Sequence, residues 1–368
     1  MNLDIFEILR EAFSMGASDI HISTDEKPIF RVSGSMKIQE KYPVLDLETA
    51  RHLVEQGMED ENKKIFDDEK DLDFAIEIPE VSRFRVNTFF TTKGVNAVFR
   101  IIPNEIKTID DLNLPTNLRD ILKLKKGLVI VTGPTGSGKS TTLAAIINEY
   151  NEKKRGNVIT IEDPVEFVHK PIKSIVSHRE VGKHTKSFAN ALRGATRQDP
   201  DIILVGEMRD LETILLALTA AETGILVFGT LHTSSAAKTI NRIIDVFPAE
   251  QQNQIRSVLA DSVEYIIAQN LLKKIGGGRV AALEILIGTD GIRNQIRKGE
   301  IHQIEHSIQG GKDIGMQNLS GVLNQLVKDR VVTLDEARKN AVNPDEINDP
   351  LGEMDEKNIN LADNLHIS

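Results

Sequence analysis

A glycine-rich segment near residue 135 has the residue types and spacing that bind a nucleoside triphosphate. It matches the pattern G-x-x-x-x-G-K-[ST] at every defined position and comprises Gly133, Pro134, Thr135, Gly136, Ser137, Gly138, Lys139, Ser140 and Thr141. Glycines let backbone N–H groups close around phosphate, Lys139 is expected to reach the β- and γ-phosphates, and the Ser140 hydroxyl is expected to ligate Mg²⁺. An apolar run before the segment and a helical pattern after it favour a P-loop over an ordinary glycine-rich turn.

A second apolar run, at 201–205, ends in Gly206-Glu207. In P-loop enzymes, a carboxylate at this kind of strand end lies beside the nucleotide and the attacking water. Because Gly206 has no side chain, Glu207 is the carboxylate best placed to activate that water. A surface glutamate after a core strand is the alternative interpretation, and the presence of a P-loop weakens it.

The run at 157–161 is followed by three carboxylates, Glu162, Asp163 and Glu166. Acids gathered at the ligand-binding end of a sheet repel each other unless a cation offsets them. We expect Asp163 and Glu166 to hold Mg²⁺ together with Ser140, and Glu162 to be the reserve candidate for the catalytic base. A solvated acidic loop is the alternative.

Two further groups of residues are candidates for contact with the nucleotide. His232 follows the apolar run 225–230, where its imidazole would sense the γ-phosphate by hydrogen bonding, although a lone histidine is more often structural. The predicted hairpin of 83–89 and 95–100 carries Arg85 and Arg100. A row of guanidinium groups usually marks a solvated face, but in an assembly it would offer arginine fingers to a neighbour's nucleotide.

Composition narrows the class of protein. The 368 residues suffice for two or three domains, and the absence of cysteine excludes disulfides, thiolate catalysis and cysteine-bound zinc. The formal net charge of −10 and the scarcity of aromatic residues argue against a nucleic-acid partner. No apolar run reaches the roughly 18 residues of a membrane span, and the N-terminus lacks the pattern of a secretory signal. We therefore expect a cytoplasmic protein.

The order of predicted elements indicates two α/β domains. We expect a small domain at 1–102, a linker at 103–118, an ATPase domain at 119–344 with a mainly parallel sheet, and an acidic tail at 345–368 without fixed structure. Strands of the ATPase domain are expected at 128–132, 157–161, 201–205, 225–230 and 279–287. Helices are expected at 140–150, 187–198, 209–222, 235–244, 249–271 and 316–328. In the small domain the charged segment 67–73 is expected to be a solvated face.

Taken together, the segments 133–142, 159–169, 199–210 and 220–248 resemble the secretion-type ATPases of type IV pili and type II secretion, most nearly the retraction ATPases of twitching motility. The resemblance extends from Gly16 to about residue 342. It implies a PAS-like N-terminal domain, a RecA-like ATPase domain, ATP and Mg²⁺, and a homohexamer. It also implies an inner-membrane platform partner through which the protein reaches the membrane. In this family Glu207 would be the catalytic glutamate, Glu162, Asp163 and Glu166 the acidic box, His232 part of the histidine box, and Arg85 and Arg100 the arginine fingers.

Three departures from the family pattern leave alternatives open. Ile225 stands where the family usually has a second histidine, and the retraction motif appears as residues 291–298 with Gly291 and Gln295 in place of alanine and leucine. The acidic tail lies outside the resemblance. A pilus retraction motor is the leading hypothesis, and an accessory retraction ATPase, a paralogue, is the second. A nucleic-acid translocase or a regulator that does not hydrolyse nucleotide is less consistent with the charge and with Glu207.

Overall fold

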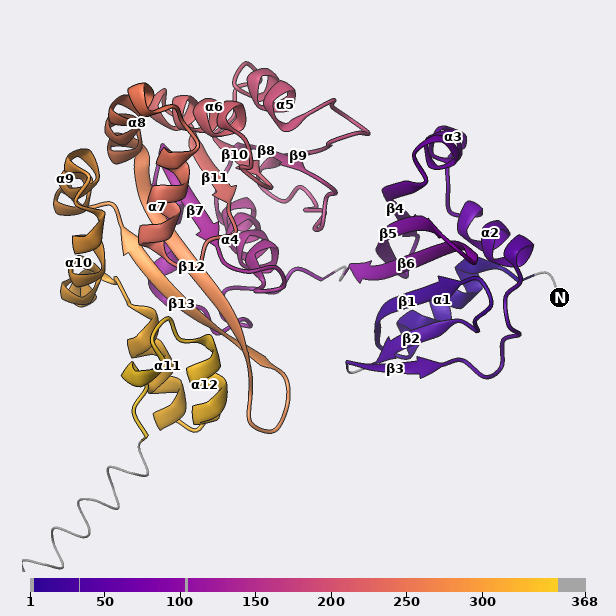
Figure 1. Ribbon diagram of the computed structural model, residues 1–368. Helices are drawn as coiled ribbons and strands as arrows, with labels where there is room; N and C mark the ends of the chain where they lie inside the picture. Colours follow the sequence, from indigo (N-terminus) through magenta and orange to yellow (C-terminus); the bar gives the residue numbers. More distant parts are fainter. Residues whose placement is uncertain (1–2, 33, 103–104, 350–368) are drawn as a thin grey trace, which may run out of the picture. The chain divides into compact units, whose positions relative to one another are not determined.

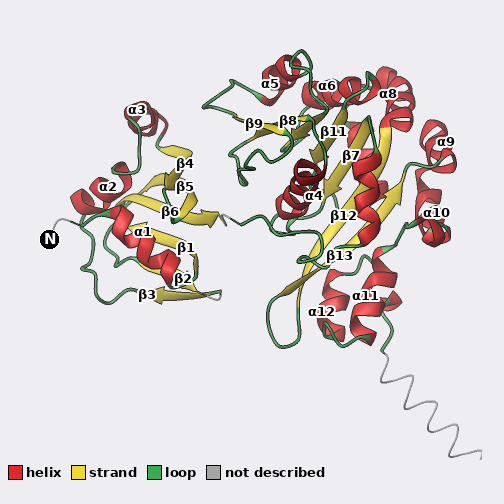
Figure 2. Ribbon diagram, turned by 180° about the vertical axis from the view of Figure 1, so that it is seen from behind, coloured by secondary structure: helices red, strands yellow, loops and turns green. Residues whose placement is uncertain are grey.

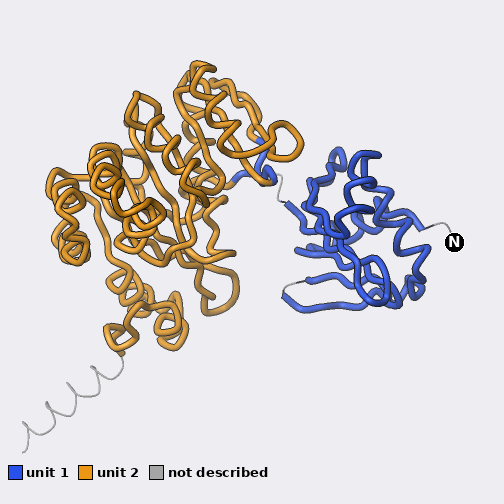
Figure 3. The backbone as a smooth tube through the Cα atoms, turned by 45° about the horizontal axis from the view of Figure 1, so that its top comes forward, with its two compact units in different colours: residues 1–106, 164–168 blue, residues 107–163, 169–368 orange. Residues whose placement is uncertain are grey.

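The computed structural model describes residues 3–32, 34–102 and 105–349, and the backbone forms two compact units (Figures 1 and 3). Unit 1 comprises Met1–Ile106 and Pro164–Val168, and unit 2 comprises Lys107–Asp163 and His169–Ser368. Residues 107–118, expected to be linker, contribute the buried side chains of Ile109, Leu114 and Leu118 to the core of unit 2.

Unit 1 is an antiparallel sheet of six strands in the order β3-β2-β1-β6-β5-β4. Its strands are β1 (Ala17–Ser23), β2 (Ile29–Val32), β3 (Ser35–Ile38), β4 (Asp71–Ile78), β5 (Ser82–Thr91) and β6 (Gly94–Ile102). Its helices are α1 (Ile5–Ser14), α2 (Leu47–Glu55) and α3 (Asp60–Glu69). Alternation along β5 and β6 buries Phe84, Val86 and Phe99 and turns the arginines to the other face.

The prediction that the charged segment 67–73 is a solvated face is confirmed, since all of its residues are exposed except the half-buried Leu72. Its first residues end α3 and its last ones begin β4, which pairs with β5 through Asp71 and Phe89. Burial begins just beyond the segment, where Phe74, Ile76 and Ile78 alternate along β4 and are buried.

Unit 2 is built on a seven-stranded sheet in the order β13-β12-β7-β11-β10-β8-β9, parallel except for the β12–β13 pair (Figure 2). The strands are β7 (Gly127–Thr132), β8 (Asn157–Glu162), β9 (Ile175–Glu180), β10 (Ile202–Val205), β11 (Leu226–Thr230), β12 (Val263–Lys273) and β13 (Arg279–Ile287). Two hydrophobic clusters flank the sheet, and β7 contributes Leu128 and Ile130 to one and Val129 and Val131 to the other. Burial on both faces explains why β7 is apolar throughout.

The helices of unit 2 follow the strands. They are η1 (Thr116–Lys123), α4 (Lys139–Lys153), α5 (Phe188–Ala195), α6 (Leu211–Glu222), α7 (Ala236–Asp245), α8 (Ala249–Ser262), α9 (Asp290–Lys298), η2 (Ile301–Gln303), α10 (Ile304–Gly310), η3 (Lys312–Ile314), α11 (Leu319–Lys328), α12 (Leu334–Asn340) and η4 (Pro344–Glu346). Side chains of Ser187, Asp210, Ser235 and Thr289 cap α5, α6, α7 and α9 at their N-termini.

The single helix predicted at 249–271 is wrong in its second half. Helix α8 ends at Ser262, and Val263 begins the eleven-residue strand β12. This strand pairs in parallel with β7 and antiparallel with β13, so its apolar run is a buried central strand. Apolar periodicity alone does not separate such a strand from a buried helix, and the sheet decides the outcome.

The described end of the chain is packed against unit 2. Residues 345–349 were expected to belong to an unstructured tail, but Ile347 is 1 % exposed and lies in a cluster with Leu272, Leu319 and Leu323. The rest of that predicted tail, 350–368, lies outside the described residues. Within the described part of the chain, no helix has the length and apolar character needed to cross a membrane.

Candidate active site

The P-loop runs from the carboxyl end of β7 into the N-terminus of α4, as its sequence predicts. Gly133 and Gly138 both have positive φ, at 140° and 88°. A Cβ on Gly133 would lie 2.2 Å from the carbonyl oxygen of Gln269, and a Cβ on Gly138 would lie 2.9 Å from its amide nitrogen. Glycine is therefore required at these positions for two reasons, backbone conformation and close approach.

Lys139, His232 and Glu207 form a continuous chain of polar contacts. The Lys139 ammonium donates to the carbonyl oxygens of Gly133, at 2.9 Å, and Pro134, at 3.1 Å, and it lies 3.5 Å from Nδ1 of His232. Nε2 of His232 lies 3.2 Å from Oε1 of Glu207. Since an ammonium group only donates, Nδ1 accepts and the ring proton is assigned to Nε2, which donates to Glu207.

Glu207 is kept ionised by its neighbours. Its side chain is 20 % exposed, and Nε of Arg209 lies 2.6 Å from Oε1. Burial raises the pKa of Glu207, but the hydrogen bond from Arg209 and the nearby His232 lower it further, so that the pKa lies below its ordinary value. At neutral pH the group is therefore an acceptor-only carboxylate, the form that a general base needs in order to orient water and accept its proton.

The strand ends are fixed to each other around this chain of contacts. The Thr132 hydroxyl, at the end of β7, lies 2.8 Å from that of Thr233, whose N–H donates to it at 2.9 Å. At the end of β10, a Cβ on Gly206 would meet Ile161 O at 3.1 Å. The tight approach of β8 to β10 thus leaves little room for an acid at 206 and places the first carboxylate at Glu207.

The three predicted acidic residues are divided between the two units. Glu162, at the end of β8, and the exposed Asp163 belong to unit 2, whereas Glu166 belongs to unit 1. Oε1 of Glu162 lies 4.0 Å from Nδ1 of His178. Since Nε2 of His178 accepts from the backbone N–H of His169 at 3.0 Å, Nδ1 carries the proton.

The predicted Mg²⁺ ligands are Ser140, Asp163 and Glu166. No group of three His, Asp or Glu side chains within the described ranges is arranged to enclose a metal ion. Mg²⁺ bound to a nucleotide usually keeps waters and phosphate oxygens and takes only one or two protein ligands, so a protein cage is not required. Ser140, half-buried in the first turn of α4, fits that role.

Arg85 and Arg100 lie on unit 1, directly across from each other on β5 and β6. Arg100 is 66 % exposed, and its Nε donates to Asp19 Oδ1 at 2.8 Å. Nε of Arg85 lies 3.7 Å from Asp73 Oδ1. Each guanidinium group thus has a carboxylate of its own unit, which offsets the repulsion between like charges across a strand pair.

The sequence alone missed two contributors to this region, Arg209 and Gln269. Arg209 lies only two residues after Glu207, so its position near the same strand end could have identified it. Gln269 gave no such signal, because it lies in the segment that was predicted to be a helix. Ile225, left out of the predicted site, precedes β11, and its carbonyl accepts from Gly127 N–H at the start of β7. The P-loop follows the other end of β7, roughly 20 Å away by the rise of a strand.

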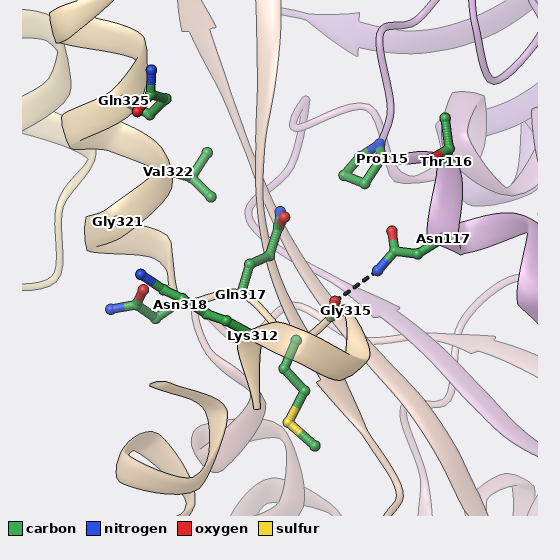
Figure 4. A pocket seen from close by; sticks show the side chains of 11 residues that line it. Pro115, Thr116, Asn117, Lys312, Gly315, Gln317, Asn318, Gly321, Val322 and Gln325 are labelled. Atoms are coloured by element: carbon green, nitrogen blue, oxygen red, sulfur yellow. Dashed lines mark hydrogen bonds between the residues drawn. The ribbon is translucent and has the colours of Figure 1, made fainter. Parts of the chain in front are cut away.

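A cleft of about 490 Å³ lies elsewhere in unit 2, between η1, η3 and α11 (Figure 4). Asn117 closes one side by donating to the Gly315 carbonyl at 2.6 Å. The residues that line the cleft include none of the predicted site residues.

Comparison with known proteins identifies the family. A family model described as "Type II/IV secretion system protein" matches residues 2–333. The chain belongs to the type II/IV secretion system protein family. Within the family it is 50 % identical over 343 residues to the type IV pilus retraction ATPase PilT of Pseudomonas aeruginosa, covering 93 % of this chain and 99 % of the relative. It is also 50 % identical over 317 residues to a twitching motility protein of Neisseria gonorrhoeae, covering 86 % of this chain and 84 % of the relative.

Solved structures of the family agree with the fold. A crystal structure of the pilus retraction motor PilT with bound ADP has a TM-score of 0.87 and 46 % identity, covering 94 % of this chain and 98 % of the other. The ATPase DotB of Legionella pneumophila has a TM-score of 0.79 at 30 % identity, covering 92 % and 95 %. The predictions of an ATPase and of a RecA-like domain with a smaller N-terminal α/β domain are confirmed.

Proposed function

We propose that the chain is the ATP-hydrolysing motor that powers retraction of a type IV pilus in twitching motility. The observation that carries this proposal is 50 % identity to the Pseudomonas retraction ATPase over 93 % of the chain. The chain of contacts from Lys139 through His232 to Glu207 supports it, because a motor must hydrolyse its nucleotide as well as bind it.

Binding of ATP begins at the P-loop. Backbone N–H groups of the loop and the N-terminus of α4 face the phosphates, and Lys139 adds a point charge at the β- and γ-phosphates. The carbonyl oxygens of Gly133 and Pro134 that hold the ammonium group keep it at the mouth of the loop.

Hydrolysis requires a carboxylate that can direct water. Glu207 fills this role, since Arg209 keeps it ionised and His232 fixes one of its oxygens. His232 links that oxygen to the ammonium group that binds phosphate, so the occupied phosphate site and the base share one hydrogen-bonded path.

Ser140 would hold Mg²⁺, with Asp163 and Glu166 as candidates for contact through water. The ion would supply charge neutralisation on the phosphate oxygens. The position of Ser140 in the first turn of α4 supports this role, as does the position of Asp163 directly after β8.

A ring of six identical subunits at the cytoplasmic face of the inner membrane, docked on a platform protein, is part of the proposal. Arg85 and Arg100 would then act on a neighbour's nucleotide. Their positions across β5 and β6 support this role, because they present two guanidinium groups on one face of a rigid sheet.

An accessory retraction ATPase is the second candidate. The Pseudomonas ATPase PilU is 37 % identical over 340 residues, and it covers 92 % of this chain. The altered motif favours this candidate, since Gln295 makes a mutual hydrogen bond with Ser307, at 2.9 and 3.1 Å, where the family pattern expects a packing leucine. The higher identity to the retraction ATPase favours the first candidate.

Deleting the gene and imaging surface pili tests the proposal. Extra pili with loss of twitching, restored by the wild-type gene and not by a Glu207→Gln gene, is the result expected of a retraction motor. Bare cells would identify an extension motor instead. Retained twitching in the deletion strain would show that retraction depends on another ATPase, as the accessory role requires.

A further inference from the structure

Gln269, on β12, lies against the P-loop and has no role assigned above. It is the residue after Ala268, which pairs with Thr132 at the carboxyl end of β7. Its side chain is only 2 % exposed. The amide of a glutamine has a donor and an acceptor, and burying either of them without a hydrogen-bond partner costs free energy.

Both ends of the amide are used on the P-loop and its helix. Nε2 of Gln269 donates to the Ser137 carbonyl at 2.6 Å, and Oε1 accepts from the Thr142 hydroxyl at 2.8 Å. Ser137 and Thr142 are themselves 2 % and 1 % exposed. One buried side chain therefore connects the P-loop backbone at Ser137 to Thr142 in the first turn of α4.

The glycines of the loop fit the same residue. A Cβ on Gly133 would meet the backbone oxygen of Gln269, and a Cβ on Gly138 would meet its side-chain nitrogen. The loop therefore lies against Gln269 at its first glycine, at the Ser137 carbonyl and at its last glycine. Three separate contacts with one residue define the width of the loop.

We propose that Gln269 is the positioning residue that fixes the P-loop in its phosphate-binding shape and so sets nucleotide affinity. It does not touch the reacting atoms. The side-chain amide of Gln269 holds the Ser137 carbonyl toward β12. The peptide N–H groups of the loop are then left to point toward the phosphates. Because the bound substrate and the transition state use the same cradle, loss of the clamp weakens both equally and raises KM with little change in kcat.

The test compares Gln269→Ala with Asn270→Ala, a matched control on the next residue of the same strand. Asn270 also donates to a backbone carbonyl, that of Asn340, at 3.0 Å, but away from the P-loop. With Mg²⁺ present, we expect Gln269→Ala to raise the Kd of ADP and of a non-hydrolysable ATP analogue by about tenfold or more. We expect kcat within about threefold of wild type, and Asn270→Ala to leave Kd unchanged.

Binding stoichiometry separates positioning from a structural role. If Gln269 serves only the fold, the variant loses part of its binding-competent protein while the remaining sites keep the wild-type Kd, and that result would overturn the inference. Thr142→Val is a milder second variant, expected to raise Kd several-fold. Because Thr142 acts on the loop only through its hydrogen bond to Gln269, the double variant Gln269→Ala with Thr142→Val should bind nucleotide no more weakly than Gln269→Ala alone. Additive losses would contradict the clamp.

The inference rests on the P-loop being the nucleotide site, which Lys139→Ala tests separately. If Lys139→Ala binds nucleotide normally, the site itself is assigned wrongly. If Lys139→Ala loses binding and Gln269→Ala keeps the wild-type Kd, the site stands and only the role of Gln269 fails.

Discussion

The two sheets of this protein use their polar side chains differently. In unit 2 the polar groups collect at the carboxyl ends of parallel strands, where Lys139, His232 and Glu207 contact one another in sequence. In unit 1, Arg85 and Arg100 stand on one face of an antiparallel sheet, and each lies within 4 Å of a carboxylate of its own unit. The first arrangement joins an ammonium group and a carboxylate through one histidine, whereas the second holds its cations in local ion pairs.

The difference follows from strand geometry. Parallel strands connected through helices bring loops from distant parts of the chain to one edge, so dissimilar groups meet there. A hairpin instead places neighbouring residues side by side, so that similar groups form a row. Unit 2 is thus suited to assembling a reaction centre, and unit 1 to presenting charge to another surface.

Removing a guanidinium group from unit 1 is the strongest test of whether that unit takes part in hydrolysis. If Arg100 acts on a neighbour's nucleotide, Arg100→Ala should reduce kcat by about 10³-fold while ADP affinity stays close to wild type. Arg31→Ala is the control, because Nε of Arg31 also approaches Asp19, at 3.8 Å, from the next strand. Turnover and equilibrium binding, measured on both variants, decide whether unit 1 takes part in hydrolysis.

Mixing two inactive variants extends the same test. Arg100→Ala and Lys139→Ala chains together should recover some hydrolysis if the finger of one subunit serves the P-loop of another. Specific activity of the wild type should also rise with protein concentration. Full activity of Arg100→Ala, or concentration-independent activity in a proven monomer, would rule out the ring.

Glu207→Gln should be the largest effect within unit 2. Glutamine keeps the size of the side chain and its contact with His232 but cannot accept a proton, so we expect kcat to fall by about 10²- to 10⁴-fold with ATP binding retained. Single-turnover hydrolysis and a binding titration check this. Hydrolysis at the wild-type rate would transfer the role of base to Glu162.

His169 tests whether a buried ionisable group near the acidic strand end affects stability rather than chemistry. It is 4 % exposed, and burial followed by the nearby His178 lowers its pKa from 6.5 to about 4. Between these values the unfolded chain binds the proton and the folded chain does not. The contribution of His169 to the free energy of unfolding is therefore fully present above pH 6.5. It falls by about 3 kcal/mol as the pH is lowered toward 4.

Denaturant titrations at a series of pH values measure that dependence. His169→Gln should flatten the fall in the free energy of unfolding between pH 6.5 and pH 4, and His306→Gln, at an exposed position, should leave it unchanged. The same steep fall in His169→Gln would assign the acid sensitivity to other groups.

The smallest effect is expected at Ile225. It lies before β11, at the opposite end of the sheet from the P-loop, and packs half-buried against the core. Ile225→His should change turnover by less than about twofold and slightly lower the melting temperature, because a polar ring replaces apolar packing. A tenfold gain in steady-state ATPase rate would contradict this and would favour the accessory role.

The sequence predicted best what depends on local pattern. The P-loop, the apolar strands on either side of it and the helices with capping residues need only neighbours in the chain, so Lys139, Glu207 and His232 stand out as candidates from their own segments. Their mutual contacts do not, because the 3.2 Å and 3.5 Å separations depend on how three strands end side by side.

The errors have a common physical origin. The structure of each mispredicted apolar segment depends on partners elsewhere in the chain. Strand β12 pairs with β7 and β13, and Ile347 packs in the cluster that contains Leu323. Gln269 was missed for the same reason, since its neighbours Ser137 and Thr142 lie on another segment. The proposed role of Arg85 and Arg100 is not encoded in local pattern either, because a contact with a neighbour's nucleotide would join residues of two chains.

The pairing of β7 also determines when the nucleotide site can form during synthesis. Both sheet neighbours of this strand come much later in the chain, β11 at Leu226–Thr230 and β12 at Val263–Lys273. A nascent chain that has emerged from the ribosome as far as Lys139 therefore still lacks the strands against which the loop packs. At about 5–20 residues per second, several seconds pass before Gln269 is made. The six-stranded sheet of unit 1 is complete by Ile102, so it can fold on the ribosome long before the P-loop has its neighbouring strands.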